Sequence, residues 1–191
     1  MASRFGSDKA FAGFRGRPMI HRVADVLASR CDELVVSVST PDSEARVRGV
    51  LPHAIVVADV RKDRGPIEGF SRGFAAARGE IVLVAPCDAP LLRPELYDRL
   101  LECLGSHEAA VPRPEVFDPL RAVYRRDAVR RVLSRDTETA SSPSALVDRL
   151  DAVFLEAGAL QAADPGLRSF FDVNRPEDLK RASEGAEATA Q

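Results

Sequence analysis

Short apolar runs alternate along the chain with stretches in which apolar residues recur every three or four positions. The runs at residues 34–39, 54–57 and 81–85 are nearly continuous and rich in β-branched side chains. Such runs are typical of strands that are covered on both faces of a sheet. We therefore predict a strand at each of these positions.

The stretches between the runs predict amphipathic helices. Pro18, Pro66 and Pro94 each precede such a stretch, and proline is favoured in the first helical turn because its missing N–H needs no partner there. After Pro18, Met19 and Val23 begin an apolar face at helical spacing. We expect helices to begin at these three prolines.

This alternation predicts a three-layer α/β/α, Rossmann-like fold with a mostly parallel sheet and right-handed βαβ units. A chain of 191 residues is typical of one domain. We assign residues 1–182 to that domain and residues 183–191, which are small, polar and acidic, to a disordered tail. Later, shorter strands are expected at residues 108–111, 121–124, 151–155 and 170–173.

Composition narrows the functional classes. A net charge of −2 with interspersed signs argues against a nucleic-acid-binding protein, which would normally be basic. A membrane span needs about 20 apolar residues, and the longest clean apolar run is that at residues 81–85. The three cysteines lack C-x-x-C spacing, which favours a reducing, cytoplasmic location over a disulfide framework.

Residues with side-chain carboxylate or amide oxygens follow the predicted strands. Asp88 comes after the run at 81–85, Asp59 follows 54–57, and Asn174 follows 170–173. Ligands of open α/β sheets bind beyond the carboxyl ends of the strands. Mg²⁺ commonly takes one or two carboxylates together with substrate phosphates, so Asp88 is a candidate metal ligand. On the residues alone, an aspartate that caps the next helix explains the same position.

The N-terminal segment carries the cations. Arg4 and Lys9 flank Gly6, which allows backbone N–H groups to approach a phosphate closely. Positive charges there would stabilise the charge that develops on a departing pyrophosphate. An exposed basic tail is the alternative interpretation of the same residues.

Three motifs resemble the nucleotide-binding signature of nucleotidyltransferases, most closely the molybdenum cofactor guanylyltransferase (MobA-type) family. Residues 4–9 (RFGSDK) resemble its R-x-G-x-D-K loop, residues 86–90 (PCDAP) its P-C-D-x-P motif, and residues 174–179 (NRPEDL) its N-x-P-E-D-L segment. The resemblance extends from residue 1 to about residue 180, in order and with matching spacing.

The resemblance implies a role for each site residue. Asp88 and Asn174 would hold Mg²⁺, and Arg4 and Lys9 would act with Asp88 as the catalytic residues by neutralising the triphosphate. The implied nucleotide-binding residues are Gly6, Lys9, Ser37, Asp59, Gly65 and Asp88.

The chain departs from the family pattern at several positions. Ser37 stands where asparagine is common, Glu68 where a small residue is usual, Asp118 in place of histidine, and Asp172 in place of the first asparagine. Met1 stands where the residue after the family's Gly-Gly turn would be. The resemblance therefore predicts a sheet without the first, central strand.

The implied reaction is Mg²⁺-dependent transfer of GMP from GTP to molybdopterin cofactor, which yields the guanine dinucleotide cofactor and pyrophosphate. Its partners would be GTP, molybdopterin cofactor, and molybdoenzymes or their chaperones. One alternative is a sibling enzyme, either a cytidylyltransferase for the same cofactor or a sugar-phosphate nucleotidyltransferase. A second alternative is a non-catalytic relative that binds the cofactor or a partner without the Gly-Gly loop.

Overall fold

The computed structural model describes residues 9–61, 64–135 and 140–187. The helices are α1 (Met19–Ala28), α2 (Pro41–Val50), α3 (Pro66–Ala76), α4 (Pro94–Leu104), α5 (Arg126–Arg135), α6 (Pro143–Val147), α7 (Ala157–Ala163) and α8 (Pro176–Glu187). The strands are β1 (Gly13–Phe14), β2 (Arg17–Pro18), β3 (Val35–Val38), β4 (Ile55–Ala58), β5 (Ile81–Leu83), β6 (Ala109–Arg113), β7 (Val123–Arg125) and β8 (Ala152–Glu156). Short 3₁₀ helices are η1 (Lys9–Phe11), η2 (Pro119–Arg121) and η3 (Arg168–Phe170).

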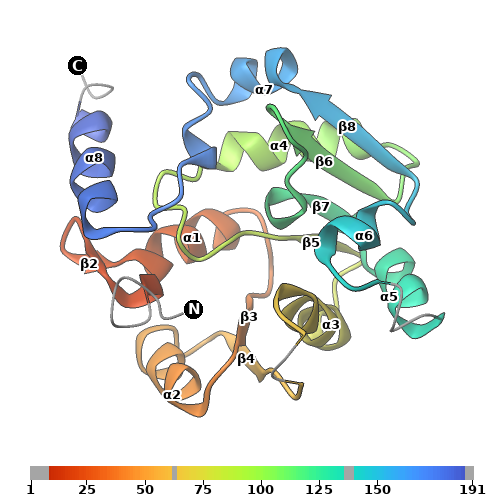
Figure 1. Cartoon of the computed structure of the whole chain (residues 1–191), viewed down its shortest axis with the longest axis horizontal. Coiled ribbons are helices and arrows are strands. Elements are labelled where there is room, and N and C mark those ends of the chain that lie inside the picture. The colour runs from red at the N-terminus through yellow and green to blue at the C-terminus, as the bar shows by residue number, and fades with distance from the viewer. Residues whose placement is uncertain (1–8, 62–63, 136–139, 188–191) are drawn as a thin grey trace.

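The chain forms three layers, as the sequence predicts (Figure 1). Alternate residues of β6 face opposite sides of the sheet, so that Val111 packs with α3, α5 and α6, and Ala110 packs with α1, α4 and α7. In β7, Tyr124 packs on the same side of the sheet as Val111, and Val123 packs on the side of Ala110. This period of two is what a strand buried on both faces requires.

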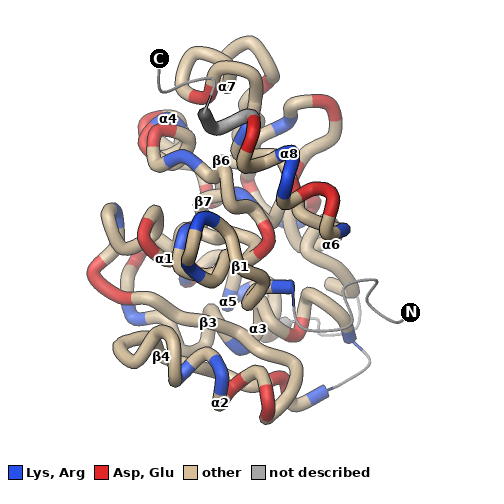
Figure 2. Tube along the Cα trace, turned by 90° about the vertical axis from the view of Figure 1, so that its left-hand side faces the viewer, with Lys and Arg blue, Asp and Glu red and all other residues tan. Residues whose placement is uncertain are grey.

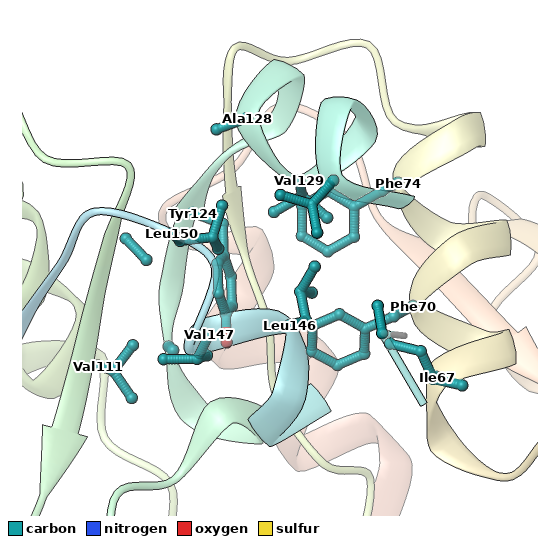
Figure 3. Packing of buried hydrophobic residues seen from close by; sticks show 14 residues of the cluster. Ile67, Phe70, Phe74, Val111, Tyr124, Ala128, Val129, Leu146, Val147 and Leu150 are labelled. Atoms are coloured by element: carbon teal, nitrogen blue, oxygen red, sulfur yellow. The ribbon is translucent and has the colours of Figure 1, made fainter. Parts of the chain in front are cut away.

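An aromatic cluster fixes α3 against the sheet (Figure 3). The rings of Phe70 and Phe74 are stacked at 5.6 Å, and each meets Tyr124 edge-on, at 5.8 and 5.7 Å. The Tyr124 hydroxyl donates a hydrogen bond to the Pro119 carbonyl at 2.7 Å. Packing of this kind holds the beginning of α3 and the η2 turn in fixed positions relative to the strands.

The sheet is mixed, because β7 runs in the opposite direction to its neighbours. β3 pairs with β4 and β6 with β8 in parallel, but β7 runs antiparallel to both β5 and β6. Only the η2 turn joins β6 to β7, and a parallel pair needs a crossover connection of a dozen or more residues. The short connection therefore reverses the direction of the chain. The prediction of a mostly parallel sheet did not identify this antiparallel strand.

The strands divide into two hydrogen-bonded groups, β3–β4 and β5–β7–β6–β8. Within the described residues, β3 has no partner other than β4, and β5 has none other than β7. One edge of β3 and one edge of β5 therefore have no hydrogen-bonded neighbouring strand among the described residues. The family resemblance predicts a further, central strand between these two segments, at residues 34–39 and 81–85.

Two predictions about the C-terminal region are wrong. Residues 170–173 form no strand, because Leu167 adopts φ 51° and leads into the η3 turn. Residues 183–187, predicted to belong to a tail, continue α8, and residues 188–191 lie outside the described residues.

Charge is spread over the molecule. Figure 2 shows Lys and Arg interspersed with Asp and Glu over the face in view. None of the helices in the described ranges has the length and apolar character that a membrane crossing demands.

Candidate active site

The loop after β5 carries Asp88 at the carboxyl end of the strand. The backbone continues along β7 as far as Val84, whose N–H donates to the Ala122 carbonyl at 2.9 Å. The Tyr97 hydroxyl of α4 donates to the Val84 carbonyl at 2.7 Å. Ala89 is fully buried, which fixes the loop, while the Asp88 side chain retains 13% exposure. The carboxylate is therefore presented at the sheet edge by a rigid loop.

Lys9, Asp88 and Asn174 meet at this edge. The Lys9 ammonium forms an ion pair with Asp88 and donates a hydrogen bond to Asn174 Oδ1 at 3.1 Å. The backbone supports the arrangement, since Val173 N–H donates to the Asp88 carbonyl at 2.9 Å. Three residues from distant parts of the sequence thus converge as the motifs predict.

The donor set fits a magnesium ion. One carboxylate and one amide oxygen already surround a single cation, the Lys9 ammonium. Mg²⁺ prefers oxygen ligands and is usually held by one or two protein carboxylates together with phosphates and water. In the part of the chain that the structure describes, no group of three or more Asp, Glu, His or Cys side chains is placed to hold a metal.

Arg4 and Gly6, the other predicted phosphate-binding residues, lie outside the described residues.

A buried arginine lies beside this cluster. Arg121 is only 3% exposed and forms ion pairs with both Asp118 and Asp172. Burial raises the pKa of the Asp172 carboxyl; Arg121 opposes that shift and Asp88 adds to it. Both acids are departures from the family pattern, and they bind the same guanidinium.

Sequence reasoning missed Arg121. The available signal was a charged residue beside the apolar run at residues 122–124, where a buried charge needs partners.

A second group lies at the carboxyl ends of β3 and β4. The Ser37 hydroxyl donates to Asp59 Oδ1 at 3.3 Å. Burial raises the pKa of Asp59, and the Ser37 hydrogen bond opposes the shift. A Cβ at Gly69 would lie 3.0 Å from Ser37 Oγ, so α3 can pack this closely only because residue 69 is glycine.

Gly65 and Glu68 shape the beginning of α3. Gly65 precedes the helix with φ 62°, in the region that favours glycine. Glu68 is 6% exposed and accepts hydrogen bonds from the N–H groups of Val60 and Arg61, at 3.2 and 3.3 Å. Its charge is bound to the loop after β4, so it stabilises that loop.

The two groups are separate in their contacts. Among the described residues, no hydrogen bond or ion pair connects Ser37 or Asp59 with Lys9, Asp88 or Asn174. Each group occupies the carboxyl ends of its own strands, which is the ligand-binding edge of such sheets.

Comparison with known proteins identifies similar sequences along nearly the whole chain. Residues 1–153 match the model of a family described as the MobA-like NTP transferase domain. The "Probable molybdenum cofactor guanylyltransferase" of Natronomonas pharaonis is 36% identical over 189 residues, covering 96% of this chain and 92% of that protein. A protein of the same description from Methanosarcina mazei is 31% identical over 183 residues, covering 91% and 81%.

Solved structures share the fold. Molybdopterin-guanine dinucleotide biosynthesis protein A from Archaeoglobus fulgidus superposes with a TM-score of 0.79 at 24% identity, covering 97% of this chain and 93% of that one. The 2-C-methyl-D-erythritol 4-phosphate cytidylyltransferase from Thermus thermophilus gives 0.66 at 19% identity, covering 94% of both. These likenesses establish a nucleotidyltransferase fold.

Proposed function

The chain belongs to the MobA-like NTP transferase family, and from this premise we propose that it transfers GMP from GTP to molybdopterin cofactor and releases pyrophosphate. The transferred guanylyl group and the molybdenum cofactor in this proposal are inferred from the names of the relatives. The observation that carries the proposal is the convergence of Lys9, Asp88 and Asn174 on one point at the carboxyl end of β5.

In this proposal Asp88 and Asn174 hold Mg²⁺. When bound, the ion neutralises phosphate charge and orients the phosphate oxygens. Lys9 exchanges its contact with Asp88 for a phosphate oxygen, because a triphosphate offers more negative charge than one carboxylate. The protein then acts by positioning and by electrostatic stabilisation, with no covalent nucleophile on the chain.

We assign the nucleoside to the second group. Ser37 and Asp59 present a hydroxyl and a carboxylate at the ends of β3 and β4. Gly65 is the N-cap of α3, and the N-terminus of a helix favours an anion. These are the groups that would contact the ribose, base or phosphates of GTP.

The proposal places the reaction in the cytoplasm. Cys31, Cys87 and Cys103 all lie in the described residues and form no disulfide there, as a reducing compartment favours. Molybdoenzymes or their chaperones would receive the product.

A pyrophosphate-release assay tests the proposed function. The protein is incubated with Mg²⁺, molybdopterin cofactor and either GTP or CTP, and the product is identified by mass spectrometry. Pyrophosphate with GTP and a guanine dinucleotide product support the proposal. Turnover with CTP alone identifies a cytidylyltransferase, and binding without turnover identifies a non-catalytic relative.

Removal of the Lys9 ammonium is expected to weaken GTP binding. A hydrogen bond to a charged group contributes about 1.5–3 kcal/mol, so Lys9→Ala should raise the Kd for GTP by about tenfold or more. Lys180→Ala is the matched control, because Lys180 is an exposed lysine of α8; its Kd should change by less than about twofold. Calorimetric titration at one fixed salt concentration measures both, since salt screens such contacts. Equal losses in the two variants would reject the phosphate role.

A further inference from the structure

All three nitrogen atoms of the Arg121 guanidinium have partners. Nε donates to the Ser169 carbonyl at 2.7 Å, Nη1 is paired with Asp118, and Nη2 is paired with Asp172. The planar fork of an arginine fixes the directions of its N–H groups. A guanidinium held at two of these three points therefore fixes the third.

The first two contacts go to groups that are themselves held. Asp118 Oδ1 accepts the Leu120 N–H at 2.9 Å and so caps the η2 turn. Ser169 is fully buried; its N–H donates to Asp164 Oδ2 at 2.8 Å, and its hydroxyl accepts the Arg93 N–H at 3.1 Å. Two groups whose own positions are fixed by hydrogen bonds therefore hold the Arg121 guanidinium.

The third contact leads to the active-site edge. The Asp172 side chain is 39% exposed, compared with 20% for Asp118 and 4% for Arg121. Its neighbour Val173 is fully buried and donates its N–H to the Asp88 carbonyl. Asp172 therefore directly precedes the residue whose backbone is bound to the Asp88 loop.

We propose that Arg121 is a positioning residue, which holds the Asp172 carboxylate beside Asp88 as a further ligand for the cation bound by Asp88 and Asn174. The inference rests on the proposed function, because it takes a divalent cation with GTP to occupy this point. The positioning role of Arg121 differs from a purely electrostatic role of its guanidinium. A positive charge alone would repel the cation, whereas a positioning residue strengthens its binding.

Arg121→Lys separates the two roles, since lysine keeps the charge and loses the fork. Mn²⁺ is titrated into the full chain with GTP, and protein-bound Mn²⁺ is followed by its electron paramagnetic resonance spectrum. Positioning predicts that Arg121→Lys needs about tenfold more Mn²⁺ for half-saturation, as loss of groups that orient metal ligands typically does. Half-saturation at the wild-type concentration, or tighter binding in Arg121→Met, overturns the proposal.

A double-mutant cycle identifies the group through which Arg121 acts. Asp172→Asn alone should weaken Mn²⁺ binding by about tenfold, and Arg121→Lys should add less than about twofold in the Asp172→Asn background. Equal effects of Arg121→Lys in both backgrounds contradict action through Asp172.

Asp118→Asn is the matched control, because it removes a negative charge from the same guanidinium at the buried end, while its amide oxygen can still accept the hydrogen bond of Arg121 Nη1. It should change Mn²⁺ half-saturation by less than about threefold. This comparison remains decisive if circular dichroism shows that Arg121→Lys does not fold, since equal losses in Asp118→Asn and Asp172→Asn overturn the proposal. A wild-type protein that binds no GTP with Mn²⁺ overturns both this inference and the proposed function, whereas normal wild-type binding with an indifferent Arg121→Lys overturns this inference alone.

Discussion

Asp88→Asn is expected to lower the rate of nucleotidyl transfer by about a hundred- to a thousandfold, the loss typical of removing one preorganised electrostatic group from an active site. The substitution keeps the shape of the side chain and removes the charge that, together with the Asn174 amide oxygen, contacts the Lys9 ammonium. Folding should survive, because the contact that ties Asp88 to the C-terminal segment uses its backbone carbonyl and the Val173 N–H.

The measurement is the transfer rate as a function of Mg²⁺ concentration, with the melting temperature as the folding control. Asp98→Asn is the matched variant, since Asp98 forms a comparable ion pair with Arg30, at 2.6 and 2.7 Å, on the exposed face of α4. It should retain the wild-type rate. A near-wild-type rate for Asp88→Asn at limiting Mg²⁺ would remove the metal role from this residue.

The sequence predicts the elements whose signals are local. Pro18, Pro66 and Pro94 mark the beginnings of α1, α3 and α4 within a residue, because the preference of proline for a first turn depends only on its own backbone. The apolar runs that become β3, β4 and β5 are similarly local. Asp88 could be placed at the edge of the sheet because it follows such a run directly.

The features that the sequence could not predict depend on distant contacts. The antiparallel direction of β7 follows from the short η2 connection, and an apolar run does not reveal strand direction. Residues 170–173 have a strand-like composition, yet their single backbone link to the loop of Asp88 comes from Val173. The partners of Arg121 lie up to 51 positions away, so the apolar run beside it could indicate its burial but could not identify its partners.

A strand supplied between β3 and β5 is expected to raise both the melting temperature and the affinity for GTP. These two strands each have an edge without a partner in the described residues. Helices already cover both sides of the region. Ile20 of α1 packs with β3 and β4, and Val23 of α1 packs with Leu83 of β5. On the other side, α3 contacts β3 and β4, and Phe70 packs in the cluster that includes Val82.

The residues along these edges are less buried than their apolar character favours. Val35 and Val36 are only partly buried, and Ile81 is 37% exposed. A central strand would add ladder hydrogen bonds and bury apolar surface, at about 1.5–3 kcal/mol for each side chain that becomes fully buried. In a domain of this size each kcal/mol raises the melting temperature by about 2–4 °C, so a gain of at least about 10 °C is expected from a few such side chains.

The test adds about a dozen residues before Met1, enough for one strand of about six residues and a turn that ends in Gly-Gly. The turn matters for GTP, because glycine lets backbone N–H groups approach the phosphates closely. The control is an extension of equal length in which the apolar residues are replaced by serine, and which therefore cannot bury a side chain between α1 and α3. Calorimetric melting and GTP titration are compared for the three proteins. If the 191-residue chain melts cooperatively within about 2 °C of the apolar extension, a shift worth no more than about 1 kcal/mol, and binds GTP equally well, then the open edges of β3 and β5 are a stable feature of the sheet, and the strand predicted between them has no place in it.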